Sequence, residues 1–193
     1  MNVWTNNVKM FVSTRASENL FDCIRVQSYV TVTGNPGVGK TATMRYVGLK
    51  MRRNGYTVVP TNTPVDIRNF SKKGKRMLFV DDVCGQYTVD PYRIGRWQEM
   101  SEVIHQLFEN KYCKLISTCR LQIVNDVKFR SVPFLKYCEC NLNSNELCLT
   151  SGERSNLALK YFKGKAGQVR AFSEEHFCVV YTKKRIMLIS NLF

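Results

Sequence analysis

Apolar and polar positions along the chain alternate with two different periods. Residues 14–26 and 40–53 carry apolar side chains at spacings of three and four, as expected for helices that bury one face. Between them, residues 29–33 form a largely β-branched run that ends at a glycine, which predicts a buried strand followed by a tight turn. The pair Asn54 and Gly55 gives a stop signal for the second helix. The opening part of the chain therefore predicts a helix, a strand, a loop and a helix.

The alternation of strands and helices continues along the chain. Strands are predicted over residues 56–59, 77–80, 113–118 and 136–142, helices over 64–70, 93–110 and 150–162, and a helix or turn across 121–129. This order favours a parallel sheet covered by helices on both faces. Beyond the last helix, glycines interrupt the pattern, and the apolar runs at 177–181 and 186–189 have no clear partner. We expect an N-terminal arm over residues 1–10, one α/β domain over 11–162 and a basic C-terminal extension over 163–193.

The composition fits one globular domain. With 193 residues, of which 44% are hydrophobic and 23% charged, the chain lies outside the disordered, collagen-like and membrane classes and is too short for two full α/β domains. No stretch approaches the roughly 18 apolar residues that a membrane-spanning helix requires, and the polar start gives no secretory signal. Eight cysteines without paired CxxC spacing indicate reduced, mostly buried thiols, so a cytoplasmic location is expected.

The charge balance is strongly basic. There are 29 Lys and Arg residues against 15 Asp and Glu, a formal net charge of +14, and a field of this sign attracts phosphate in nucleotides, nucleic acids or anionic lipids. Nucleic-acid binding is not favoured, because no basic run is interleaved with aromatic residues as in a base-stacking module. Cys138, Cys140 and Cys148 with His176 offer the alternative of a zinc site, but Cys-x-Cys spacing is also that of a strand with mixed faces.

The first chemical motif is the glycine-rich turn after the first predicted strand. It consists of Gly34, Asn35, Pro36, Gly37, Val38, Gly39, Lys40 and Thr41, which match GxxxxGK[ST] and open a helix. In this pattern backbone N–H groups point at the β-phosphate, Lys40 reaches the β- and γ-phosphates, and the Thr41 hydroxyl binds Mg²⁺. Ala42 follows, with its backbone N–H near the α-phosphate. The turn predicts a site for Mg-ATP or Mg-GTP, and the absence of an Asn/Thr-Lys-x-Asp guanine-reading motif favours ATP.

Two acids follow the strand predicted over residues 77–80. The four apolar residues of this strand lead directly into Asp81 and Asp82, which is the Walker B pattern. We expect Asp81 to hold Mg²⁺ through water and Asp82 to orient or deprotonate the attacking water. A helix cap or turn is the structural alternative for the pair. Because Asp82 is shorter than the Glu that many ATPases place here, slow hydrolysis is expected.

A third polar strand end follows the strand predicted over residues 113–118. The apolar run ends in two hydroxyl-bearing residues and then reaches Arg120. We interpret Arg120 as a sensor of the γ-phosphate, because a guanidinium can form two hydrogen bonds to phosphate oxygens and so distinguish a triphosphate from a diphosphate. A surface arginine that merely follows a strand is the alternative.

These motifs together resemble a known family. In order and spacing, the segments FVSTRA (Phe11 to Ala16), TVTGNPGVGKT, MLFVDDVCG and KLISTCR resemble the STAND class of P-loop NTPases, and within it the novel STAND NTPase 3 domain. The resemblance implies a three-layer ATPase core whose five-stranded, mainly parallel sheet has the order 5-1-4-3-2. It implies a nucleotide-driven switch in signalling or innate defence, with protein partners or self-association through the NTPase domain. It also implies that Arg15 approaches the base or phosphates, with helix capping or ion pairing as the alternative.

Three functions are compatible with the motifs. The leading one is a switch domain that binds ATP and Mg²⁺ and is an ATPase of low turnover. The second is a small-molecule or nucleoside kinase, against which there is no arginine-rich lid segment between the fourth and fifth predicted strands. The third is a nucleic-acid-binding module in which the nucleotide site is vestigial.

Overall fold

The computed structural model describes residues 11–70, 74–109 and 112–161. The arm predicted over 1–10 and the extension predicted over 163–193, with its two apolar runs, lie outside these residues. Five strands form one sheet in the order β2-β3-β4-β1-β5. Their bounds are β1 (Tyr29–Gly34), β2 (Thr57–Pro60), β3 (Arg76–Val80), β4 (Cys113–Arg120) and β5 (Glu139–Asn141). Every neighbouring pair is parallel, so the predicted fold class and the strand order 5-1-4-3-2, counted from the other edge, are confirmed.

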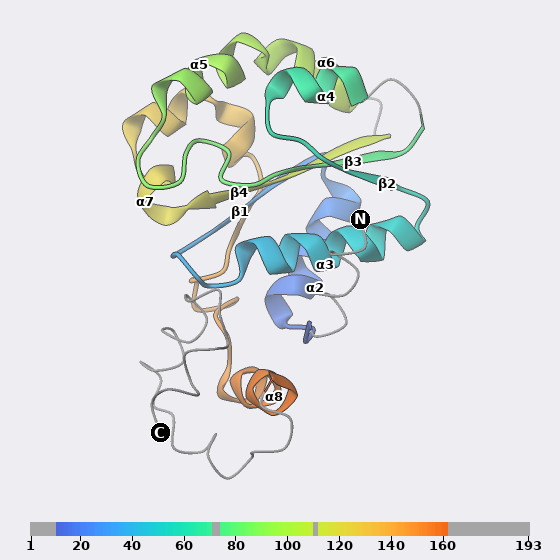
Figure 1. The fold of residues 1–193 in the computed structure, drawn as a ribbon, viewed down its shortest axis with the longest axis vertical. Coiled ribbons are helices and arrows are strands. Elements are labelled where there is room, and N and C mark those ends of the chain that lie inside the picture. The colour runs from blue at the N-terminus through green and yellow to red at the C-terminus, as the bar shows by residue number, and fades with distance from the viewer. Residues whose placement is uncertain (1–10, 71–73, 110–111, 162–193) are drawn as a thin grey trace.

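Helices cover both faces of the sheet and produce three layers (Figure 1). One face carries α2 (Arg15–Val26) and α3 (Lys40–Arg53), and the other carries α4 (Pro64–Phe70), α5 (Pro91–Glu99), α6 (Ser101–Glu109) and α7 (Leu121–Val124), with the 3₁₀-helices η1 (Val127–Ser131) and η2 (Pro133–Lys136). Successive side chains of a strand point to opposite faces. On β3, Phe79 therefore packs in the core under α2 and α3, whereas Leu78 packs in the core on the other side.

A glycine lets α3 approach the sheet closely. At Gly48 a Cβ atom would lie 2.2 Å from Cζ of Phe79, so the phenyl ring fills the space that a side chain would need. Val47 and Met51 of the same helix are buried against the sheet as well. This packing holds the start of α3 beside the carboxyl end of β1.

Side-chain caps begin several of the helices. Thr14 Oγ1 accepts a hydrogen bond from the Ser17 N–H at 3.2 Å, and Ser17 Oγ accepts one from the Thr14 N–H at 2.9 Å, which is a capping box for α2. Asp90 accepts hydrogen bonds from the N–H groups of Tyr92 and Arg93 at 3.0 and 3.2 Å and begins α5. These caps satisfy backbone donors that have no partner inside the helix.

The single helix predicted over residues 93–110 is wrong. The structure has two helices here, since α5 ends at Glu99, α6 begins at Ser101 and Met100 lies between them. The two helices pack on different elements: α5 contacts η1, whereas α6 contacts α4 and β4. The apolar period is nearly continuous across the break, so only the choice of packing partners separates the halves.

The strand predicted over residues 136–142 is also too long. It is confined to Glu139–Asn141, because the residues before it form η2, which Pro133 begins and which buries Phe134 and Leu135 in the core. The strand predicted over 113–118 is instead extended by two residues and ends at Arg120.

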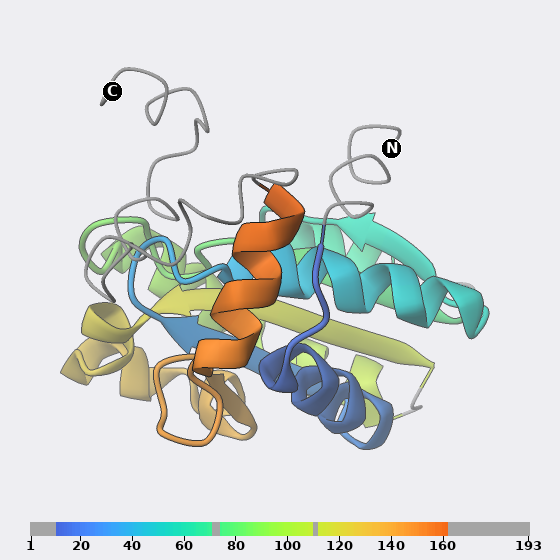
Figure 2. The same ribbon diagram turned by 90° about the horizontal axis from the view of Figure 1, so that it is seen from below.

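The last described helix, α8 (Ser151–Tyr161), runs beside the segment that leads into α2 (Figure 2). Thr150 and Glu153 form reciprocal hydrogen bonds at its start, as in a capping box. Lys160 near its end donates a hydrogen bond to the carbonyl oxygen of Phe11 at 3.0 Å. Within the described ranges, no helix has the length and apolar character needed to cross a membrane.

Candidate functional site

The loop between β1 and α3 curls around a lysine. Gly37 and Gly39 have φ angles of 81° and 98°, in the left-handed region that favours glycine, so the turn depends on them. Inside the curl, Lys40 Nζ donates hydrogen bonds to the carbonyl oxygens of Gly34 and Asn35, each at 2.9 Å. Lys40 is only 7% exposed. Its ammonium group is thus held on the inner side of the turn, at the N-terminal end of α3.

The remaining loop residues lie around this lysine. Pro36 is exposed, Val38 is half-buried, and Ala42 belongs to the first turn of α3. The Asn35 N–H donates a hydrogen bond to Asn143 Oδ1 at 2.7 Å, so a side chain that follows β5 fixes the loop from the opposite side. Asn143 was not among the residues expected from the sequence, where only its place directly after the last strand could have indicated it.

The two acids at the end of β3 are organised by hydroxyl groups. Thr41 Oγ1 lies 2.9 and 3.0 Å from the two carboxylate oxygens of Asp81, to which it donates. Thr118 Oγ1 donates to Asp81 Oδ1 at 2.5 Å and accepts from the Asp82 N–H at 2.9 Å. Arg93 Nη1 donates to the Asp82 carbonyl oxygen at 3.1 Å. Asp82 has a φ of 49°, so its backbone is held in the left-handed region that few residues with side chains adopt.

Burial and charge shift the acid–base behaviour of this cluster. Burial raises the pKa of Asp82, and the neighbouring Asp81 carboxylate raises it further, while Arg120, Lys40 and Arg93 act in the opposite direction. Burial lowers the pKa of Lys40, which the two carboxylates partly offset. Desolvation therefore makes Asp82 a stronger base than an ordinary aspartate, beside a lysine whose charge a bound anion would stabilise.

Arg120 occupies the last position of β4, level with Gly34 at the end of β1 in the parallel register. Its guanidinium carbon lies 4.8 Å from the centre of the Tyr87 ring. Because β4 lies between β1 and β3, the carboxyl ends of all three strands meet at one edge of the sheet. The glycine loop, the acidic pair and Arg120 are therefore brought together, as expected for ligand sites of open α/β sheets.

The oxygen atoms of this cluster suit a hard divalent cation. The Thr41 hydroxyl and the Asp81 carboxylate lie within hydrogen-bond distance of each other, and hydroxyl and carboxylate oxygens are the ligands that Mg²⁺ prefers, together with water and phosphate. Asp81 is exposed, so water molecules have access to it. The residues predicted to hold Mg²⁺ thus fit this metal in chemistry and placement.

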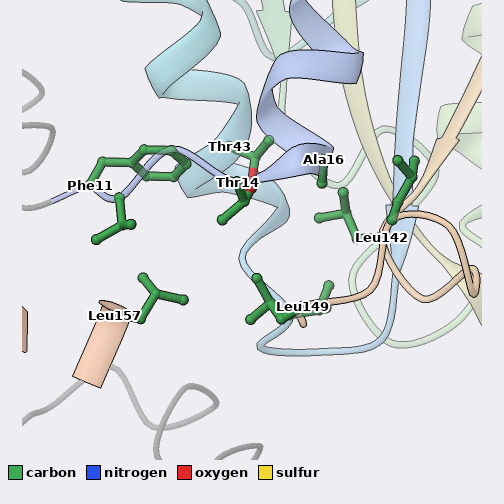
Figure 3. A pocket seen from close by; sticks show the side chains of 10 residues that line it. Phe11, Thr14, Ala16, Thr43, Leu142, Leu149 and Leu157 are labelled. Carbon is green, nitrogen blue, oxygen red and sulfur yellow. The ribbon is translucent and has the colours of Figure 1, made fainter. Parts of the chain in front are cut away.

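An apolar pocket opens beside the glycine loop (Figure 3). The empty space of about 370 Å³ in and in front of it includes open solvent, so the enclosed part is small; the pocket is lined by Phe11, Val12, Thr14, Ala16, Val38, Thr43, Leu142, Leu147, Leu149 and Leu157. These residues come from the segment before α2 and the first turn of α2, from the loop and α3, and from the chain between β5 and α8 together with α8 itself. The sequence motifs contain Phe11 to Ala16 but gave no indication of this pocket, since its wall joins distant parts of the chain.

Arg15 is held by α8 and the chain before it. Its backbone N–H donates to Glu153 Oε1 at 2.6 Å, its Nε lies 3.7 Å from Glu153 Oε2, and its Nη2 donates to the Cys148 carbonyl oxygen at 2.7 Å. The ion-pairing alternative for Arg15 is therefore the one that the geometry supports. The pair fastens the start of α2 to the start of α8.

The cysteines among the described residues do not gather into a metal site. In the part of the chain that the structure describes, no three His, Cys, Asp or Glu side chains form a group that could hold a metal ion, and His176 lies outside that part. Cys140 is buried and Cys148 is exposed. Burial raises the pKa of Cys140 to about 12, as expected for an unreactive thiol.

The sheet order, the glycine loop around Lys40 and the acidic pair define a P-loop NTPase domain. More particularly, the chain belongs to the novel STAND NTPase 3 family, whose sequence model matches residues 11–163. No match was found among the curated proteins.

Several solved structures have a similar fold. A DNA replication initiation factor has a TM-score of 0.56 and 16% identity, with 96% of this chain and 62% of that chain covered. The ORC1 protein of Aeropyrum pernix in complex with DNA has a TM-score of 0.55 and 14% identity, covering 79% and 50%. The replication initiator DnaA bound to AMPPCP and single-stranded DNA has a TM-score of 0.54 and 15% identity, covering 96% and 62%. This chain thus spans half to three-fifths of their lengths, and the likeness concerns the fold.

Proposed function

We propose that the chain binds ATP with Mg²⁺ at the glycine loop and hydrolyses it slowly, as a nucleotide-dependent switch. The observation that carries this proposal is the convergence of Lys40, Thr41 and Asp81, with the lysine inside the curled loop and the threonine hydroxyl on the carboxylate. A phosphate chain requires backbone donors, a fixed cation and a metal ligand on one side, and this edge of the sheet supplies all three.

Each residue has a separate task in this proposal. The loop from Gly34 to Ala42 surrounds the phosphates and donates to them from the backbone N–H groups of Gly39 to Ala42, and Lys40 neutralises charge on the β- and γ-phosphates. Thr41 and Asp81 hold Mg²⁺, Asp81 through water; the metal neutralises charge on the phosphates when it is bound. Asp82 accepts a proton from the attacking water while the water oxygen bonds to the γ-phosphorus and the bond to the β–γ bridging oxygen breaks. Arg120 donates hydrogen bonds to the γ-phosphate.

The apolar pocket provides a place for the base. It adjoins the loop at Val38 and is lined by apolar side chains that include Phe11 and Leu157, so a base that lies against it can contact them while the phosphates remain at the loop. We infer that adenine occupies it, since the sequence lacks a guanine-reading motif.

The switch follows from contacts that only a triphosphate makes. Arg120, Lys40 and Asp82 lie close enough for their charges to affect one another, and a γ-phosphate would change the balance among them. A ligand shifts an equilibrium only by its difference in affinity for the two states, and here that difference lies in the γ-phosphate contacts. The coupling to signalling or innate defence, through protein partners or self-association, is proposed from the family.

Equilibrium binding and turnover test the proposal. Nucleotide released from the purified protein by denaturation should be ATP or ADP when identified by mass. Lys40→Ala should weaken Mg-ATP binding at least about 30-fold, since it removes the buried cation. Lys50→Ala is the matched control: Lys50 lies on the same helix and forms an ion pair with Glu18 away from the loop, so its replacement should leave ATP binding unchanged. Release of phosphate without any acceptor supports an ATPase over a kinase; wild-type affinity in Lys40→Ala contradicts the site.

The net charge of +14 favours one second candidate function, nucleic-acid binding. Binding of this kind is dominated by phosphate contacts and weakens steeply as salt is raised. If single-stranded DNA or RNA binds with such a salt dependence, and Lys40→Ala abolishes ATP binding without affecting it, the second function is supported. Absence of binding at low salt removes it.

A further inference from the structure

Arg120 is held by an aromatic ring and not by an acid. Its guanidinium carbon lies 4.8 Å from the centre of the Tyr87 ring, and no ion pair of Arg120 with an acid occurs among the residues that the structure describes. Tyr87 is 71% exposed and contributes to neither hydrophobic core. The contact with Arg120 is therefore the main packing contact of the ring.

The backbone around Tyr87 is fixed independently of its ring. Gly85 has a φ of 119°, and a Cβ atom there would lie 2.3 Å from the Thr88 carbonyl oxygen, so only glycine fits this turn. The Asp90 N–H donates to the Cys84 carbonyl oxygen at 2.9 Å, which closes the loop.

A second contact ties the loop to β4 and α7. Gln122 Nε2 donates to the Tyr87 carbonyl oxygen at 2.6 Å, only two residues beyond Arg120 in the chain. The backbone turn at Gly85 and the side chain of Gln122 thus place the ring beside the guanidinium. Gly85 and Gln122 determine where the ring lies, and the ring determines where the guanidinium lies.

A ring is a suitable partner for an arginine that must bind phosphate. The guanidinium is planar, so an aromatic ring contacts its face while its N–H donors point outward in the plane. A carboxylate in the same place would use those donors. The ring consequently orders Arg120 and leaves its hydrogen bonds available for a ligand, which reduces the conformational entropy that the side chain loses on binding.

We propose that Tyr87 is a positioning residue for Arg120 and thereby sets the preference of the site for a nucleoside triphosphate over a diphosphate. This inference rests on the proposed function, in which Arg120 contacts the γ-phosphate. Tyr87 itself touches no phosphate; it acts through the orientation of the guanidinium.

The dissociation constants of Mg-ADP and Mg-ATP, taken as a ratio, test this inference. Tyr87→Leu should lower the preference for ATP about two- to fivefold, the contribution of an exposed cation–π contact, while ADP affinity stays the same. Tyr87→Phe should retain the wild-type ratio, because the ring face remains. Tyr92→Leu is the matched control: Tyr92 is 76% exposed on the neighbouring helix, and no contact with Arg120 is described for it, so its ratio should be that of the wild type.

Arg120→Gln distinguishes a failure of the role proposed for Tyr87 from a failure of the sensor role proposed for Arg120. If it lowers the ATP preference and Tyr87→Leu has no further effect in its background, the two residues act as a unit. If Arg120→Gln lowers the preference but Tyr87→Leu alone does not, or weakens ATP and ADP equally, the role of Tyr87 is overturned and Arg120 stays the sensor. If Arg120→Gln leaves the ratio unchanged, the sensor role in the proposed function fails, and the role of Tyr87 fails with it.

Discussion

Replacing Thr118 by valine tests how far one buried hydroxyl organises the acidic end of β3. Thr118 is 0% exposed, and its hydroxyl both donates to the Asp81 carboxylate at 2.5 Å and accepts the Asp82 N–H at 2.9 Å. Valine has nearly the same shape but can form neither bond. Because no cavity is created, the effect of the change measures hydrogen bonding.

The expected loss of stability follows from the two bonds. A hydrogen bond to a charged group contributes about 1.5–3 kcal/mol, and an N–H left without a partner costs about 1–3 kcal/mol. Asp81 is exposed and keeps the hydrogen bond from Thr41, so the loss of its bond from Thr118 should cost about 1.5 kcal/mol, the lower end of the first range. We expect Thr118→Val to lower the free energy of unfolding by about 2.5–4.5 kcal/mol, which for a domain of this size lowers Tm by about 5–18 °C.

The same change should weaken the metal site. Residues that hydrogen-bond a metal-binding carboxylate, and so orient it, typically contribute about 10- to 100-fold to metal affinity. The Mg²⁺ concentration that half-saturates ATP binding should rise by a factor in this range in Thr118→Val. Thr118→Ser keeps the hydroxyl and should retain most of the wild-type Mg²⁺ dependence, although the lost methyl group lowers its Tm.

Two results would refute this reasoning. An unchanged Mg²⁺ dependence in folded Thr118→Val means that the hydroxyl does not orient Asp81 for the metal. A larger effect of serine than of valine means that the methyl group, and not the hydroxyl, is what matters. Urea unfolding of both variants, followed by ATP titration at several Mg²⁺ concentrations, separates these results.

Asp82→Asn should lower the rate of phosphate release by about 10²- to 10⁴-fold with ATP affinity nearly unchanged, as for loss of a general base, and a wild-type rate excludes that role. Burial raises the pKa of Asp82, so the acidic limb of the wild-type pH–rate profile should lie above the ordinary aspartate range and be absent from the variant. Because the pKa of Asp82 is raised in the folded state, ionisation of this carboxyl destabilises the fold, and the free energy of unfolding should fall as pH rises from the ordinary aspartate pKa to the raised one. Urea unfolding at several pH values should show this slope only in the wild type. Gly48→Ala should cost about 1–3 kcal/mol because its Cβ would lie 2.2 Å from Phe79 Cζ, whereas Gly95→Ala, with nothing within 4 Å, should gain about 0.5–1 kcal/mol; shifts of the same sign in thermal unfolding contradict this packing. Leu157→Ala should weaken ATP binding about tenfold but not tripolyphosphate binding in calorimetry, and equal losses exclude the pocket as the base site.

Much of the fold was predictable because short patterns specify it. The helix predicted over residues 40–53 is observed as Lys40–Arg53, since its apolar stripe and the Asn54-Gly55 stop are local signals. The strand predicted over 29–33 differs by one residue from Tyr29–Gly34. Sheet order was predictable through resemblance to a family, not through any local pattern.

The errors occurred where packing partners decide the structure. The helix predicted over 93–110 breaks at Met100 because its halves pack on different elements, and the strand predicted over 136–142 is short because Phe134 and Leu135 enter the core as a 3₁₀-helix. Periodicity reports which residues are apolar, but not which neighbour each of them meets.

The sequence by itself determined the glycine loop, the acids that follow β3 and the arginine that ends β4, because each is a run of consecutive residues with its own chemistry. Only the tertiary structure decided which side chains join them. Thr118 meets Asp81 across 37 residues of chain, and Asn143 meets Asn35 across 108. Such contacts depend on the order and register of parallel strands, and these arise from the packing of the whole sheet between its two layers of helices.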